Sequence, residues 1–162
     1  MSETGLILRT AQDIANQHGL LTEPWPHFAH PDGRLHLAAV IFRAVTGKTP
    51  AAFTNDLPKA LLLIQTNETV MGTLRWISAV LPTEPPHDEA TGEDDHLEHI
   101  ATWLEEPDFF TQRRPNTSDV IGVLGRTAQT ADTLTDLPRQ RTTDESYKPT
   151  ARLCIPAPRH AA

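Results

Sequence analysis

Histidine and carboxylate side chains gather at the start of one expected helix, where they could bind a metal ion or move protons. Asp95, His96 and His99 lie close together in the chain. Residues three or four apart share a helix face, so His99 should lie beside both Asp95 and His96. Zinc and other divalent ions accept such ligands, and a histidine beside a carboxylate can act as a general base. We treat these three residues as candidate metal ligands. The simpler interpretation is an acidic, solvated helix face.

A polar pair on the most apolar segment is a second candidate. His36 and Arg43 are seven residues apart and therefore lie on one stripe of an expected helix. Polar groups on a buried helix must find partners or reach water. They could line a small pocket in which Arg43 donates to an anion, or the stripe could simply face solvent. Trp103 completes the set of candidate binding residues.

A third group surrounds the Pro31-Asp32-Gly33 turn. His27 and His30 precede the turn and His36 follows it, so the three imidazoles could converge. These residues belong to a loop at 20–33 that also holds Trp25 and Phe28, which we call the aromatic loop. Packing of this loop and formation of the turn explain the same pattern without a site.

Several motifs of catalysis and recognition are missing from the sequence. No phosphate-binding glycine loop and no Gly-x-Ser-x-Gly elbow occurs. Cys154 has no His-Asn set near it in the chain. Basic residues do not alternate with Trp25, Trp76 and Trp103, as they would in a base-stacking surface. We therefore assign no catalytic residue and expect no cofactor. The alternative to this expectation is a bound divalent metal such as zinc.

Helical periodicity predicts the elements that position these residues. Val70, Leu74, Ile77 and Leu81 form one buried stripe, and proline-containing loops separate six helical segments. We expect two helices at residues 2–18 and 33–46, a third that begins near 55, and a fourth from about 66 to 81. A fifth is expected at 94–106, and a sixth begins near 117. The predicted fold is all-α: a compact bundle of about five or six helices over residues 1–134, followed by a disordered, mildly basic tail over 135–162.

The charge is distributed unevenly along the chain. Of a net charge of −7, residues 61–110 hold eleven acids and one base, whereas residues 111–162 hold eight bases and five acids. An acidic surface repels phosphate backbones, so nucleic-acid binding by the folded body is disfavoured. Arg139, Arg141, Lys148 and Arg152 leave open a nucleic-acid contact through the tail.

Composition indicates where the protein works. The chain has one cysteine, no apolar run long enough to span a bilayer, and neither a basic start nor an apolar core near Met1. We expect a cytoplasmic protein without a membrane contact.

Three places in the sequence carry a family resemblance. They are His18-Gly19, the Asp32-Gly33-Arg34-Leu35 turn, and Trp103, Pro107 and Arg114 ahead of Val120-Ile121 and Leu124. In these places the chain resembles a family of small actinobacterial all-helical domains of unknown function. Leu20 stands where members often have tryptophan, and Trp103-Leu104-Glu105-Glu106 stands where a Trp-Asn-Asp run is expected. The resemblance covers most of residues 3–132 and implies an all-helical fold and an actinobacterial, plasmid or phage-like source, but no catalytic residue.

These observations favour a non-enzymatic helical binding or regulatory module that acts through protein-protein contact and could form a homodimer. One alternative is a small metal-dependent, hydrolase-like enzyme that uses His96, His99 and a nearby carboxylate. The other is a nucleic-acid regulator that acts through the basic tail.

Overall fold

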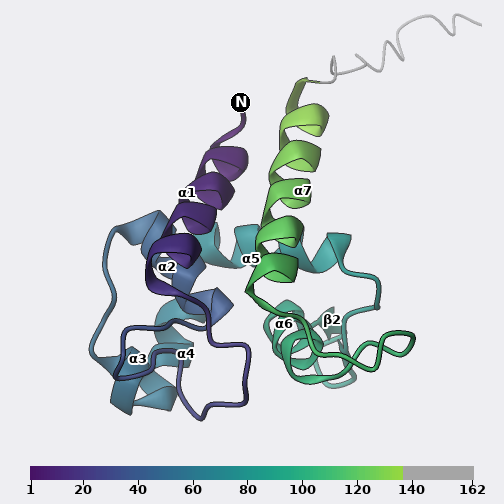
Figure 1. Cartoon of the computed structure of the whole chain (residues 1–162). Helices are drawn as coiled ribbons and strands as arrows, with labels where there is room; N and C mark the ends of the chain where they lie inside the picture. The colour runs from purple at the N-terminus through teal and green to yellow at the C-terminus, as the bar shows by residue number, and fades with distance from the viewer. Residues whose placement is uncertain (137–162) are drawn as a thin grey trace, which may run out of the picture.

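The computed structural model describes residues 1–136, and these residues confirm the all-α prediction (Figure 1). The predicted tail lies almost wholly outside the described residues. No helix in the described part is both long and apolar enough to cross a membrane. The elements in chain order are α1 (Glu3–His18), α2 (Leu37–Thr46), α3 (Ala52–Asn55), α4 (Leu57–Gln65), α5 (Glu68–Val80), β1 (His87–Asp88), β2 (Glu93–Asp94), α6 (His96–Glu105) and α7 (Thr117–Asp136).

Short polar side chains mark the starts of the helices. The side chains of Ser2, Asp56, Asn67 and Asp95 accept hydrogen bonds from backbone N–H groups in the first turns of α1, α4, α5 and α6. Such caps satisfy donors that have no partner inside the helix. The observed starts lie within about two residues of the expected ones.

Helix α2 begins later than expected. We predicted a helix from Gly33, but α2 starts at Leu37 because the preceding residues are extended. Leu35 forms backbone bridges with Leu20 and Ala29, which tie it to the aromatic loop. The Nδ1 atom of His36 then accepts the N–H of Ala38 and caps the helix. Tertiary pairing therefore overrides the helical pattern of this segment.

Two short elements were not predicted. Helix α3 is a single turn, too short for periodicity to reveal. Within the acidic, proline-rich loop of residues 82–95, β1 and β2 pair antiparallel, with His87 opposite Asp94 and Asp88 opposite Glu93. Gly92 adopts a positive φ of 72° in the turn between them. Apart from Pro85, all residues of this loop are exposed, which fits its acidic, proline-rich composition.

Helix α5 lies at the centre of the bundle, in contact with α1, α2, α4, α6 and α7. Its stripe of Val70, Leu74 and Ile77 is fully buried, as predicted. The first six residues of α2 are also buried, which fits an apolar helix packed on several neighbours.

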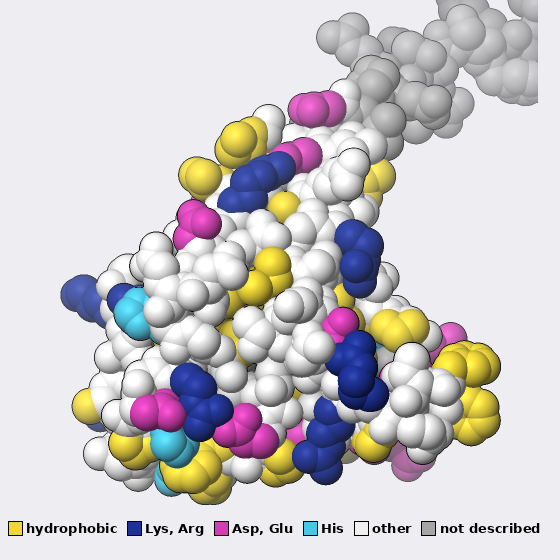
Figure 2. All heavy atoms as spheres, in the orientation of Figure 1, with side chains coloured by type: hydrophobic (Ala, Val, Ile, Leu, Met, Phe, Trp, Pro, Cys, Tyr) yellow, Lys and Arg dark blue, Asp and Glu magenta, His cyan; other side chains and the backbone are white. Residues whose placement is uncertain are grey.

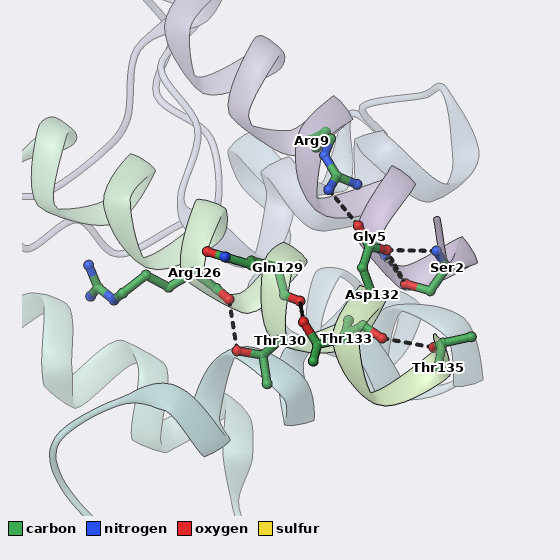
Figure 3. A network of polar contacts seen from close by, with 10 residues as sticks. Ser2, Gly5, Arg9, Arg126, Gln129, Thr130, Asp132, Thr133 and Thr135 are labelled. Carbon is green, nitrogen blue, oxygen red and sulfur yellow. Dashed lines mark hydrogen bonds and ion pairs between the residues drawn. The ribbon is translucent and has the colours of Figure 1, made fainter. Parts of the chain in front are cut away.

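Helices α1 and α7 pack side by side (Figure 1). The side-chain amide of Gln12 donates to the carbonyl of Ile121 at 3.0 Å. A Cβ atom at Gly125 would lie 3.1 Å from that same amide nitrogen, so the glycine permits the close approach. Farther along the pair, Asp132 binds Ser2 and Arg9 (Figure 3).

Candidate functional site

Helix α6 forms a wall between two grooves. His99, Trp103 and Glu106 line one side, whereas Glu98 and Glu105 line the other. Each set lies on one face of the helix, because residues three, four or seven apart share a face. We call the first the α6–α7 groove, because α6 and the loop that joins it to α7 form most of its wall, and the second the aromatic-loop groove.

The structure distributes the predicted site residues over both grooves. Trp103 and His99 lie in the α6–α7 groove, whereas His36 and Asp95 lie in the aromatic-loop groove. Arg43 lines neither groove; it sits in the last turn of α2, where its carbonyl accepts the N–H of Gly47. Neither groove is therefore the predicted pocket that His36 and Arg43 share.

The imidazole of His99 joins two segments in the interior. Its Nδ1 lies 2.7 Å from Ser78 Oγ and its Nε2 lies 2.8 Å from Thr83 Oγ1. The residue is 2% exposed. Burial, together with the charge of nearby His96, lowers the pKa of His99 and favours the neutral ring. A neutral imidazole has one donor and one acceptor, which match the two hydroxyl groups.

The three candidate metal ligands have other partners. Ser78 Oγ also lies 3.0 Å from Nδ1 of His96, so this hydroxyl connects the two histidines. Asp95 faces the other groove and caps α6 by accepting the N–H of Glu98. Among residues 1–136, no group of three His, Cys, Asp or Glu side chains is placed to hold a metal ion. The arrangement is that of a structural hydrogen-bond network.

The second predicted histidine group is also divided. His30 contacts the carboxylate of Asp32 at 2.9 Å and packs edge-on against Trp25. The backbone N–H of Arg34 is the main cause that lowers the pKa of Asp32, to about 2. His27 and His36 face the aromatic-loop groove instead. The turn is therefore held by its own ion pairs, which include Arg34 with Glu23.

The α6–α7 groove is mostly apolar. Its volume is about 460 Å³, within the range of ligand pockets. Three carboxylate residues stand among the lining, and none of the lining residues in the described part is Lys or Arg. The apolar and aromatic lining comprises Pro82, Pro86, Trp103, Pro107, Phe109, Phe110 and Pro115, and the acids are Glu84, Glu106 and Asp108.

Phe109 and Phe110 project from the α6–α7 loop into solvent. They are 80% and 89% exposed, and their rings meet edge to face with centroids 5.4 Å apart. Figure 2 shows hydrophobic side chains gathered at the edge of the molecule that this loop forms. Single exposed apolar residues are common, whereas adjacent ones that form a patch are typical of binding surfaces. Sequence reasoning missed this pair, although two adjacent aromatics in a polar, proline-flanked loop were a usable signal.

Hydrogen bonds hold the loop that carries the two rings. The carboxylate of Asp108 accepts the N–H groups of Phe110 and Thr111. The bond from Thr111 is the largest cause that lowers the pKa of Asp108. At the other end, Arg113 pairs with Asp119 at 2.7 Å. The exposed rings are therefore presented by an ordered turn, which reduces the entropy cost of binding.

The aromatic-loop groove has a different character. Its volume is about 480 Å³, and it lies between loop 25–28, α4 and α6. Burial lowers the pKa of His36 to about 4, so its ring is neutral at pH 7. Its Nδ1 accepts the N–H of Ala38, which places the ring proton on Nε2.

Comparisons with known proteins identify no relative: no family model, no curated protein and no solved structure matches this chain. The candidate site therefore rests on the geometry of the described residues.

Proposed function

We propose that this chain is a non-enzymatic protein-binding module. Its binding site is the α6–α7 groove, and its ligand is an apolar segment of another protein flanked by Lys or Arg residues. The observation that carries the proposal is the exposed Phe109–Phe110 pair beside a groove with Trp103 in its wall.

Burial of the two phenylalanine rings supports this function energetically. Each ring that moves from water into a protein contact gains roughly 1.5–3 kcal/mol. Aromatic anchors next to a pocket are typical of the residues that dominate interface energies. Since hydrogen bonds already fix the loop, little of this gain is spent on ordering it.

The charge around the groove favours a basic partner. Residues 76–112 contain ten acids and no Lys or Arg. Glu84, Glu106 and Asp108 lie directly in the groove wall. In the loop that leads to α7, Arg113 pairs with Asp119 and also attracts Asp108, whereas Glu84 and Glu106 belong to no ion pair among the described residues. Complementary charge speeds association and selects partners, whereas screened rim charges add little affinity.

The two alternative functions have less support. A metal-dependent enzyme needs a ligand set, but His99, His96 and Asp95 bind other protein groups. The nucleic-acid hypothesis depends on Arg139, Arg141, Lys148 and Arg152, all of which lie outside the described residues. The folded part that is described presents acids around both grooves, which disfavours phosphate binding.

Selection from a displayed peptide library on the immobilised whole chain tests the proposal. We expect an enriched consensus with Leu, Ile, Val or Phe between Lys or Arg residues. Affinity for a consensus peptide should fall several-fold between about 50 and 300 mM salt, because the electrostatic part is screened. Removal of the rim charges in an E84Q/E106Q variant should weaken both the affinity and its salt dependence. Acidic consensus peptides, or no enrichment, would contradict the proposal.

A further inference from the structure

The aromatic-loop groove lies on the opposite side of α6 and takes no part in the proposed protein contact. Part of its wall is apolar: Trp25 and Phe28 come from the loop, Leu57 and Leu61 from α4, and Leu97 and Ala101 from α6. Histidines, acids and Gln65 form the polar part of the wall. Trp25 and Leu57 are each 38% exposed, so the apolar surface is open to a ligand. An open groove of about 480 Å³ is large enough for a small organic molecule.

Acids without basic partners border this groove. Glu98 and Glu105 form one stripe of α6, and Asp95 stands at its start. Within residues 1–136, none of the three belongs to an ion pair. His36 is neutral at pH 7, and no Lys or Arg is among the described lining residues. The groove therefore combines an apolar body with an uncompensated negative edge.

Loop 25–28 also contains an incomplete hydrogen-bond arrangement. Nδ1 of His27 is buried and has no hydrogen-bond partner among the described residues. A buried polar atom without a partner costs about 1–3 kcal/mol, and such atoms in native proteins call for a functional explanation. His27 also lines the groove, but its Nδ1 is closed to solvent, so this atom does not contact a ligand in the groove.

We propose that the aromatic-loop groove binds a small organic cation, an amine attached to an aromatic or aliphatic body. The body packs between Trp25, Phe28 and the leucines, and the ammonium group faces Glu98 and Glu105. Aromatic rings and carboxylates are the two protein groups that attract ammonium ions. This site is independent of the protein-binding function assigned to the α6–α7 groove.

Three ligands of nearly equal shape test the charge requirement: 2-phenylethylamine, 2-phenylethanol and phenylacetate. Titration of the ¹⁵N-labelled whole chain should give the tightest binding for the amine and the weakest for phenylacetate. Amide shifts should be confined to loop 25–28 and to the face of α6 that carries Glu98 and Ala101. Tryptamine, which has a larger ring, should bind the same residues.

Variants on the two faces of α6 supply the matched control. An E98Q/E105Q variant should weaken binding of 2-phenylethylamine by about threefold to tenfold, as expected for the loss of two partly screened charges, and leave 2-phenylethanol unchanged. E106Q removes an acid of the α6–α7 groove and should change neither the affinity for 2-phenylethylamine nor that for 2-phenylethanol. The proposal is overturned if neither amine binds at millimolar concentration, if phenylacetate binds as well as the amine, or if E106Q has the same effect as E98Q/E105Q.

Discussion

At the scale of single residues, His36 links local structure to pH. Its ring packs edge-on against Phe28, with centroids 5.3 Å apart, and its Nδ1 caps α2. Burial lowers its pKa from 6.5 to about 4. The folded chain therefore keeps the ring neutral over a pH range in which the unfolded chain binds a proton. The stability that this group contributes is complete above pH 6.5 and is lost as the pH falls toward 4.

Substitution of His36 by asparagine should flatten this part of the pH profile. Asparagine is a good N-cap and can accept the N–H of Ala38, but it does not titrate. The wild-type free energy of unfolding should fall between pH 6.5 and 4 with a slope of up to about 1.4 kcal/mol per pH unit from this residue, and the variant should fall less steeply. Urea unfolding followed by tryptophan fluorescence measures the free energy of unfolding of the wild type and the variant at each pH. If the free energies of unfolding of the wild type and the His36→Asn variant fall equally with pH, the lowered pKa of His36 is wrong. A residual slope is expected because the lowered pKa of His99 acts in the same direction.

The candidate site residues show what sequence patterns cannot reveal at this scale. The spacing of His96 and His99 correctly placed them on one helix, but not their hydroxyl partners. Ser78 and Thr83 come from α5 and the loop after it, so only the tertiary fold brings them to His99. Trp103 and His36 line grooves and Arg43 lines neither of them, and a binding role for these residues stays a prediction.

At the scale of elements, the contact between the start of α1 and the end of α7 depends on Gly5. The carboxylate of Asp132 accepts bonds from the backbone and side chain of Ser2 and from Arg9 (Figure 3). These bonds lower the pKa of Asp132, the backbone N–H of Ser2 being the largest cause. A Cβ atom on Gly5 would lie 2.3 Å from the Asp132 carboxylate. No side chain fits there without moving the two helices apart or breaking the bonds.

A Gly5→Ala variant should therefore lose about 1–3 kcal/mol of stability, the usual cost of overpacking. Gly72 in α5 is the matched control, because a Cβ atom there meets nothing within 4 Å. Gly72→Ala should gain about 0.5–1 kcal/mol, since alanine loses less backbone entropy in a helix interior. Chemical unfolding of both variants provides the comparison. Equal effects of the two substitutions would show that the α1–α7 contact does not depend on Gly5.

Helix positions were predictable from sequence, because capping side chains and apolar periodicity are local signals. The start of α2 was not, since backbone bridges between Leu35 and two distant residues decide it. The single-turn α3 and the hairpin at 87–94 are too short for periodicity to reveal. The aromatic-loop groove escaped prediction because it is assembled from segments far apart in the sequence, at 25–36, 57–65 and 95–105. The α6–α7 groove comes from residues 82–115 alone, but its shape depends on how two loops fold against α6.

At the scale of the whole molecule, the first and last helices of the described residues are in contact with each other. The chain start and the end of α7 are joined through Asp132, and the core of α1, α2, α5 and α7 lies within residues 1–136. The fold should therefore not require residues 137–162.

Truncation after Asp136 should leave the helical circular dichroism signal and the melting temperature nearly unchanged. Truncation after Gln129 removes Asp132 and the last turns of α7, and should lower the melting temperature by several degrees. Thermal unfolding of both truncated chains and the full chain tests this expectation. A drop of about 5 °C or more in the chain that ends at Asp136 would show that the tail supports the fold.

The most direct test of the protein-binding function is the affinity of a selected consensus peptide for an F109S/F110S variant. Both rings are 80% or more exposed, so the substitution should leave stability intact. Leu62→Ser is the matched control, because Leu62 is 60% exposed and lines neither groove. We predict that the dissociation constant rises at least about tenfold for F109S/F110S and does not change for Leu62→Ser. Equal affinities for F109S/F110S and the wild type would contradict the central claim.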